Sequence, residues 1–384
     1  MGIIAFLIVL SVLVLIHEAG HFLVARLFKV KAEEFGYGFP PRIVGMVKEG
    51  KKWKRVGPKD QGPYRNTIWS VNWLPLGGFV RIKGEQADGV DDPDSFHAKA
   101  AWKRMLILAA GVCMNWLLAF VLFATVFMIG TNAVIEDLPS TAIVRDASVR
   151  ITQVLTDSPA DAAGLHVNDV ILAVGGVAPK DWQQAKDLIA SHDSTTFPIR
   201  VKRDNATLDV QTTPAYVKSL DRVAIGIGMA DVGVVRFKPL DAIWAAARTT
   251  GGYTKLVLVT FWELGRDLVT RKPVTTEIAG PVGIAVMTGE IAQQGIIPLL
   301  QFAAILSINL AVVNFLPIPA LDGGRVLFLA IEKVRRKPMN RNLEAAIHNI
   351  VFLILIGVIV LVTIRDLSVY GGGIVLGLRK FVGI

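Results

Sequence analysis

The sequence predicts a polytopic α-helical membrane protein with four transmembrane helices and an inserted α+β module. Of its 384 residues, 52% are hydrophobic and only 19% are charged, and the mean hydropathy of +0.49 is high for a soluble domain. Four apolar stretches are long enough to cross a membrane. Between the second and the third, a segment of about 75 residues alternates apolar and polar side chains, as short strands do.

The four predicted spans are taken in chain order. Residues 1–28 form the first, and the lack of a basic start and of a small-residue cleavage site excludes a signal peptide. Three further runs are almost free of charged residues, and we predict spans there over 105–130, 296–322 and 345–364, with a short apolar tail over 365–384. The single cysteine, Cys113, excludes an internal disulfide framework.

The distribution of charge predicts the orientation of these spans. The loop at 29–104 carries 15 Lys and Arg against 9 Asp and Glu, and residues 325–346, which largely cover the second loop at 323–344, carry 6 against 2. Both loops are therefore predicted to be cytoplasmic, with residues 131–290 on the outer side. The net charge of +9 thus indicates topology rather than nucleic-acid binding. The basic run Lys48–Lys59 favours topology or membrane-lipid contact over nucleic acid, because no aromatic, glycine-rich segment of an RNA-binding type accompanies it.

The outer segment is predicted to hold one small folded module over residues 142–215. Its Ser158–Leu165 and Asn168–Ile171 segments resemble the signature of bacterial PDZ domains, with Asn168 where glycine is usual. The resemblance implies binding of an extended peptide or a substrate ectodomain, while a rigid spacer is the alternative. The expected strands cover 149–155, 170–174, 199–201 and 208–210, with helices from Ser158 to about Gly164 and over 182–190, and a hairpin turn at Asp204–Asn205.

Residues 216–290 are predicted to be a linker with amphipathic surface helices. The apolar patch at 256–262 is bracketed by Lys255 and Glu263 and is too short to span. We expect it on an amphipathic helix at the outer membrane surface, with a buried core helix as an equal alternative.

The first span contains the strongest chemical signal in the chain. His17-Glu18-Ala19-Gly20-His21 is an HExxH motif. On a helix, residues four apart share a face, so both imidazoles can reach one Zn²⁺ while Glu18 lies beside it as a proton shuttle. Ionisable side chains inside a span are costly, which favours a functional role over two histidines bonded to backbone carbonyls.

A catalytic zinc usually takes three protein ligands, so a third polar residue is expected at similar depth in another span. Asp322 is the candidate, because it follows a segment in which Pro317 and Pro319 interrupt the third apolar run. Taken alone, Asp322 could simply end a span at the interface. Opposite an HExxH motif, a ligand role is the better interpretation.

Together these motifs resemble the site-2 protease family of intramembrane zinc metalloproteases. HExxH in the first span is joined by Asn314–Gly324, which reads NxxPxPxLDGG, and the PDZ-like module is similar to the regulator-of-sigma-E branch. Residues 77–85 are similar to the family's membrane-associated β-hairpin, here at about 71–86. Val112 departs from the proline that the family shows after glycine in the second span.

The resemblance implies roles, a location and a substrate class. Asn314 would stabilise the oxyanion or orient the substrate, with a helix-packing bond as the alternative. An edge strand would hold the unwound substrate, with an ordinary amphipathic hairpin as the alternative; its residues are Gly78, Phe79, Val80, Arg81, Ile82 and Lys83. The implied location is a bacterial inner membrane, with the zinc site toward the cytoplasm. Asn115 and His348 are interpreted as a helix-packing and an interfacial residue.

The implied substrates are single-pass membrane proteins, namely anti-sigma-factor remnants and, as a second class, remnant signal peptides. A catalytically silent scaffold that binds peptides through the PDZ-like module is the main alternative function. A zinc transporter is disfavoured because transporters tend to repeat their halves.

Overall fold

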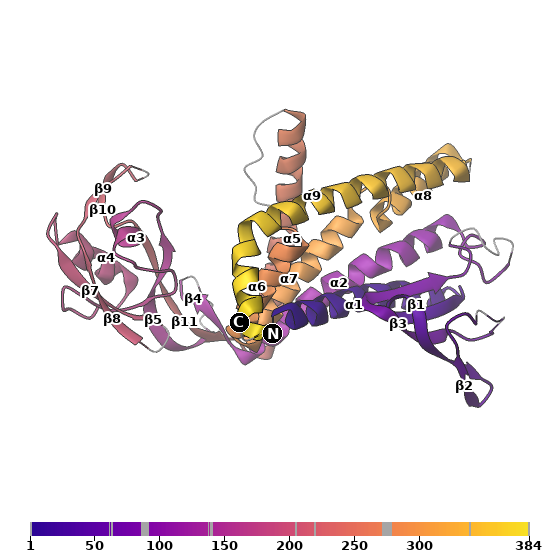
Figure 1. The fold of residues 1–384 in the computed structure, drawn as a ribbon, viewed down its shortest axis with the longest axis horizontal. Helices are drawn as coiled ribbons and strands as arrows, with labels where there is room; N and C mark the ends of the chain where they lie inside the picture. Colours follow the sequence, from indigo (N-terminus) through magenta and orange to yellow (C-terminus); the bar gives the residue numbers. More distant parts are fainter. Residues whose placement is uncertain are drawn as a thin grey trace. The chain divides into compact units, whose positions relative to one another are not determined.

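The computed structural model describes residues 2–60, 62, 64–85, 92–136, 138, 141–203, 206–218, 220–270, 279–337 and 339–382. The chain divides into two compact units (Figure 1). The first contains residues 1–123 and 246–384, and the second contains residues 124–245. The motifs with metal-binding potential all lie in the first unit.

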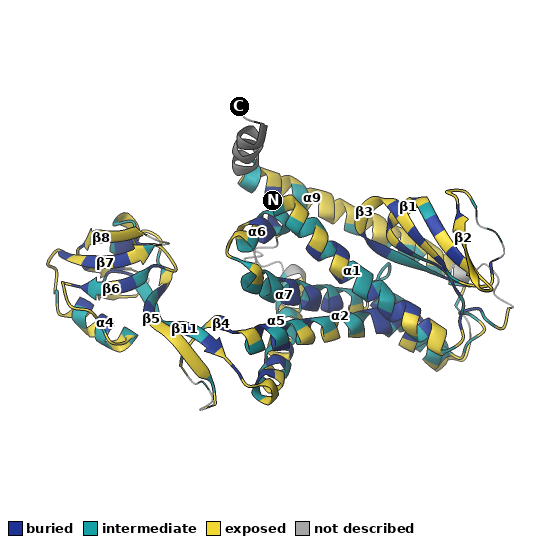
Figure 2. Ribbon diagram, turned by 90° about the horizontal axis from the view of Figure 1, so that it is seen from below, coloured by how far each residue is buried: buried dark blue, intermediate teal, exposed yellow. Residues whose placement is uncertain are grey.

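Four helices in the described part of the chain are long and apolar enough to cross a membrane, in agreement with the four predicted spans. They are α1 (Gly2–Leu27), α2 (Ala101–Ile129), α7 (Ile296–Phe315) and α9 (Arg341–Val382). The apolar side chains of α9 are largely exposed, as expected for contact with lipid (Figure 2). The helix also continues well past residue 364, so most of the predicted separate tail over 365–384 is part of α9.

The third span ends earlier than the predicted 296–322. Helix α7 stops at Phe315 because Pro317 and Pro319 lack the amide hydrogens that a helix needs. A second helix, α8 (Asp322–Arg335), begins at the aspartate, within what was expected to be a loop. Gly323 lies so close to the Phe315 and Leu316 carbonyl oxygens that any side chain there would collide with them. The close contact places Asp322 directly beside the end of α7.

A β-sheet packs against α1 and consists of β1 (Ala32–Glu49), β2 (Lys52–Val56) and β3 (Ile68–Ile82) in the order β2-β1-β3. Glu34 in the first half of β1 pairs with both Ile68 and Arg81, so the two halves of β3 flank it. Residues 78–82 therefore form an edge strand: within the described chain they pair only with the first half of β1.

The predicted hairpin at about 71–86 is corrected by this pairing. Each half of β3 takes its main-chain partner from β1, and residues 86–91 lie outside the described residues. β3 turns at Gly77, whose φ of +74° favours glycine. A Cβ at Gly77 would lie 2.7 Å from the Val14 side chain of α1, so the sheet docks closely on the first span.

Two further helices complete the first unit. The apolar patch at 256–262 lies on α5 (Pro239–Val269), where Leu256, Val259 and Trp262 are exposed, which counts against the buried-core alternative. Helix α6 (Pro281–Gln293) begins where the carboxylate of Asp366 in α9 accepts hydrogen bonds from the amides of Gly280 and Gly283. This buried carboxylate thereby caps the helix.

The second unit is built on a six-stranded sheet in the order β4-β11-β5-β6-β7-β8. The bounds are β4 Thr131–Val134, β5 Ile143–Val154, β6 Val170–Val174, β7 Phe197–Arg203, β8 Ala206–Thr212 and β11 Ile227–Arg236, with a separate pair β9 Ala215–Val217 and β10 Arg222–Ala224. Helices α3 (Pro159–Ala162) and α4 (Trp182–Ala190) cover a core that includes Ile151, Leu165 and Phe197. The expected turn at Asp204–Asn205 lies outside the described residues.

The sheet extends beyond the predicted module of 142–215. β11 lies in a region expected to be a linker, yet it pairs along most of β5, from Ile227 opposite Val154 to Arg236 opposite Ile143. Without β11, the long strand β5 would leave one row of amides and carbonyls without partners, so the module needs β11. Here we call residues 124–245 the PDZ-like unit.

The departure from the PDZ signature at Asn168 has a physical explanation. Asn168 has a φ of +76°, a left-handed conformation that asparagine tolerates better than other residues with a side chain. The turn directs Asp169 inward, where it is 1% exposed and accepts two hydrogen bonds from Arg203 and one from the His166 amide. Burial alone would raise the pKa of Asp169, but these hydrogen bonds outweigh it and hold the pKa below its usual range.

Replacing this aspartate should destabilise the PDZ-like unit. We expect Asp169→Asn to lower the free energy of local unfolding of the sheet, here called its opening free energy, by about 3 kcal/mol at pH 7, because Arg203 loses its buried partner. A carboxylate with a lowered folded-state pKa stabilises fully above its unfolded pKa. The difference should therefore begin to shrink as the pH falls below about 4 and vanish only once the pH is below the lowered folded-state pKa. Hydrogen exchange of sheet amides measures it.

The matched control is Asp209→Asn, which breaks the exposed Arg200–Asp209 pair in the same sheet. That change should alter the opening free energy much less than Asp169→Asn does, because water screens an exposed pair. Equal effects of the two substitutions would contradict a special role for the buried pair.

Candidate metal centre

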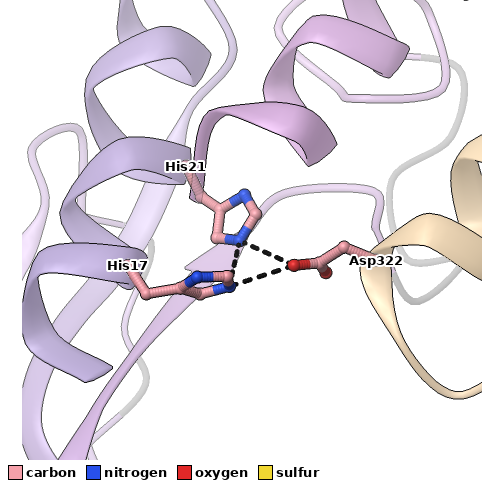
Figure 3. A group of neighbouring side chains, drawn as sticks. All are labelled: His17, His21 and Asp322. Carbon is pink, nitrogen blue, oxygen red and sulfur yellow. Dashed lines mark hydrogen bonds and ion pairs between the residues drawn. The ribbon is translucent and has the colours of Figure 1, made fainter. Parts of the chain in front are cut away.

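Helix α1 presents the HExxH histidines on one face, as the spacing requires. His17 and His21 are 6% and 7% exposed, and their Nε2 atoms lie 3.1 Å apart. Figure 3 shows both rings directed toward the same point. Two buried imidazoles this close need a shared partner that accepts their lone pairs.

Asp322 completes the group from the start of α8. Its Oδ2 lies 3.0 Å from Nε2 of His17 and 3.4 Å from Nε2 of His21 (Figure 3). The three side chains form a cluster with the composition of a metal site. The fold thus brings together the three residues that the sequence singled out, from helices 300 residues apart in the chain.

The donor set fits zinc. Ligands that surround Zn²⁺ tetrahedrally at about 2.0–2.1 Å lie about 3.3 Å from one another, close to the three separations observed here. Two neutral nitrogens and one carboxylate oxygen leave a fourth position open, as in catalytic rather than structural sites. The Nδ1 atom of His21 donates to the Ile107 carbonyl oxygen at 2.8 Å, which leaves Nε2 free to bind a metal.

Gly111 of α2 lies directly against the two histidines. A Cβ at this position would collide with Nε2 of His21 and would lie 2.7 Å from Nε2 of His17. Helices α1 and α2 pack equally closely at Gly20 of α1, where a Cβ would collide with the Ala110 carbonyl oxygen of α2. The absence of a side chain at Gly111 therefore leaves room beside the imidazole nitrogens.

Asn115, one turn further along α2, contacts the outer nitrogen of His17. Its carboxamide nitrogen lies 3.3 Å from Nδ1, whereas its buried Oδ1 has no hydrogen-bond partner within the described chain. Exchanging the two amide atoms would let Oδ1 accept a hydrogen bond from Nδ1–H and leave Nε2 of His17 as the metal-binding atom. The backbone oxygen of Asn115 also accepts a hydrogen bond from Ser307 of α7 at 2.7 Å.

His348 of α9 supports the segment that carries Asp322. Its Nδ1 accepts a hydrogen bond of 2.7 Å from the amide of Ala320, whose φ is +81°. The ring also packs on Phe328 of α8. The interfacial interpretation of this histidine stays a prediction, and the structure adds a contact that it did not include: His348 holds the strained turn that precedes the third member of the cluster.

Glu18 lies beside the edge strand of the sheet. Its Oε2 accepts a hydrogen bond of 3.0 Å from the Val80 amide, so the unpaired edge of residues 78–82 faces the HExxH helix. Gly78 also packs on α1, because a Cβ there would lie 3.0 Å from the Leu15 side chain.

The charged residues of the predicted substrate strand form ion pairs within the protein. Arg81 pairs with Glu33 and Glu34, and Lys83, just beyond Ile82, pairs with Asp92 and Asp94. Phe79 packs near Gly36 of β1. Any contact of this strand with a substrate would therefore use its main chain more than its charges.

Asn314 lies in the last turn of α7, half-buried, and its side chain makes no hydrogen bond to another described residue. The structure thus provides no evidence for the helix-packing alternative, and the role of Asn314 in catalysis stays a prediction.

The sequence analysis overlooked the metal-site roles of Gly111, Asn115 and His348. Gly111 and Asn115 are four residues apart inside a span and so share a helix face, which is a usable signal. No comparable spacing links His348 to Asp322, because their contact depends on how α9 packs against the turn.

Comparison with known proteins gives a family match. The profile of peptidase family M50 matches residues 5–56 and 60–358. The regulator of sigma-W protease RasP of Bacillus subtilis is 29% identical over 95% of this chain and 98% of its own length. The zinc metalloprotease RasP of Bacillus licheniformis is 28% identical over the same shares.

Solved structures also match part of the chain. Among them is the PDZ domain of an SdrC-like protein from Listeria monocytogenes, with 27% identity and a TM-score of 0.20, and the match covers 23% of this chain and 90% of that one.

Proposed function

The chain belongs to peptidase family M50 and is a zinc metalloprotease with several membrane-spanning helices, and on that basis we propose that it cleaves single-pass membrane proteins within their transmembrane segments. The observation that carries the proposal is the cluster of His17, His21 and Asp322 beside Glu18 on spanning helices. Anti-sigma-factor remnants are the proposed substrates, in line with the name of the sigma-W relative, and remnant signal peptides are a second class.

We assign one Zn²⁺ to Nε2 of His17, Nε2 of His21 and a carboxylate oxygen of Asp322. When bound, zinc polarises the scissile carbonyl and makes water acidic enough to lose a proton near pH 7. The remaining steps belong to the protein side chains. Asn115 and the Ile107 carbonyl hold the two imidazoles in the tautomer that directs Nε2 toward the metal.

Glu18 moves the proton. Its carboxylate takes a proton from the attacking water and returns it to the nitrogen of the leaving amide, so a single group serves as general base and then as general acid. Asn314 lies at the end of α7, and its carboxamide makes no hydrogen bond to another described residue; it is proposed to donate to the developing oxyanion.

The edge strand provides a way to hold an unwound substrate. A transmembrane helix keeps its carbonyls in internal hydrogen bonds, so a scissile segment must become extended before attack. The free edge of residues 78–82 can add an extended peptide by β-pairing, and that edge faces Glu18 through the Val80 amide. The hydrogen bond between Val80 and Glu18 would be exchanged for one to the substrate.

The charge asymmetry of the loops supports a cytoplasmic location for the sheet and α8 in a bacterial inner membrane. With four spans, the segment between the second and the third lies on the side opposite these loops. The PDZ-like unit is therefore proposed to lie on the outer side and to bind a peptide or the trimmed ectodomain of a substrate there.

Metal dependence tests the proposal. The purified protein should bind one Zn²⁺ per chain and cleave a single-pass substrate inside its apolar segment, which mass spectrometry of the fragments locates. Asp322→Ala should lose both the metal and cleavage, because two imidazoles alone bind zinc weakly. Chelation should abolish cleavage, and added Zn²⁺ should restore it. Cleavage only outside the apolar segment would contradict the intramembrane assignment.

A further inference from the structure

A basic cavity lies where the first span meets the sheet. It has a volume of about 480 Å³ and is lined by residues from the end of α1, from β1 and β2, and from the segment leading into β3. All of these residues belong to the first unit. Its cationic lining residues are Arg26, Lys29, Lys31, Lys48 and Arg65.

These cations form no close ion pairs. In the described part of the chain none of the five pairs with a carboxylate, although Lys31 lies near enough to Asp94 to lower its pKa. The one acidic lining residue, Asp94, is paired with Lys83. Five cations around one cavity repel one another, and an anion bound among them would relieve that repulsion.

The depth of the cavity indicates which anion is available. The candidate span α1 ends at Leu27, so Arg26 and Lys29 stand where the apolar helix reaches water. Trp53 and Trp69 also line the cavity and are 54% and 43% exposed. Exposed tryptophans next to Lys and Arg at the end of a span are typical of the lipid headgroup layer.

We propose that this cavity binds the phosphate headgroup of an anionic phospholipid. The guanidinium groups of Arg26 and Arg65 suit phosphate oxygens, since arginine can donate two parallel hydrogen bonds. The tryptophan rings suit the glycerol and upper acyl region, which free phosphate does not have. A bound headgroup would fasten β1 to the membrane surface, and β1 carries the edge strand that lies against Glu18.

The test measures lipid binding by the full-length chain in detergent, using native mass spectrometry with phosphatidylglycerol or phosphatidylcholine added. The protein should bind phosphatidylglycerol at least about tenfold more tightly than phosphatidylcholine. Replacing two exposed lining residues, with Lys48→Gln and Arg65→Gln combined, should abolish that preference. Neither residue contacts the metal cluster.

The matched control combines Lys52→Gln with Arg55→Gln, which removes the same charge from exposed positions on β2 that do not line the cavity. This variant should keep the preference within about twofold of the unmodified protein. Equal losses in both variants would show diffuse surface attraction and overturn the proposal, and so would an unchanged preference in the cavity variant.

A competition arm separates the two sources of phosphate. Inorganic phosphate at a large excess over the lipid should leave phosphatidylglycerol bound. If inorganic phosphate displaces phosphatidylglycerol from the unmodified protein, the cavity is a site for a soluble anion and the proposal fails. None of these readouts depends on proteolysis, so they stand or fall separately from the proposed function.

Discussion

Glu18→Gln should reduce cleavage of a transmembrane substrate by about 10²–10⁴-fold while leaving zinc binding and folding unchanged. The amide keeps an oxygen that can accept the hydrogen bond from the Val80 N–H, so the contact between α1 and the edge strand is preserved. Only the ability to take up and return a proton is lost. The measurement is the single-turnover cleavage rate, with metal content determined on the same sample.

The control for this substitution is Glu290→Gln, which makes the same chemical change on an exposed residue of α6. It should cleave at the rate of the unmodified protein. Full cleavage by the Glu18 variant would exclude the carboxylate as the proton shuttle.

The candidate cluster was predictable because its geometry is mostly local. The i, i+4 spacing of His17 and His21 places both rings on one face of any helix, so no tertiary information is needed. Asp322 required one further argument, that a carboxylate after two helix-breaking prolines can turn inward. Both inferences rest on the intrinsic geometry of a few neighbouring residues.

The parts that escaped prediction depend on packing between distant segments. The alternation of residues 79–83 indicates a strand, but it cannot show that β1 bends and pairs with both halves of β3. In the same way, β11 reads as a linker until its pairing with β5 is known. His348 contacts the turn at Ala320 only because α9 crosses beside α8.

Gly111 is the clearest example, since a glycine inside a membrane helix has several unrelated uses. It is a common means of close helix packing, and nothing in the residues near it indicates a metal site. The structure shows a more specific constraint: the space that a Cβ would fill is next to the nitrogen atoms of both histidines. This constraint has a consequence that can be measured.

Gly111→Ala should therefore weaken zinc binding by about 10–100-fold and reduce cleavage in proportion. The added methyl group would collide with Nε2 of His21, whose ring cannot retreat without losing the hydrogen bond from Nδ1 to the Ile107 carbonyl. A competition titration with a chromophoric chelator measures the affinity. Gly357→Ala is the matched control, because the same change in α9 meets no atom within 4 Å and should leave the affinity unaltered.

A second substitution distinguishes direct obstruction from a change in helix spacing. Gly20→Ala would collide with the Ala110 carbonyl and push α1 away from α2, without placing any atom between the imidazole nitrogens. If close packing alone mattered, Gly20→Ala and Gly111→Ala would weaken zinc binding equally. Because the Cβ at Gly111 would lie 2.7 Å from Nε2 of His17 as well as against His21, we expect the larger loss there. Unchanged zinc affinity in Gly111→Ala would mean that the metal lies on another side of the histidine pair.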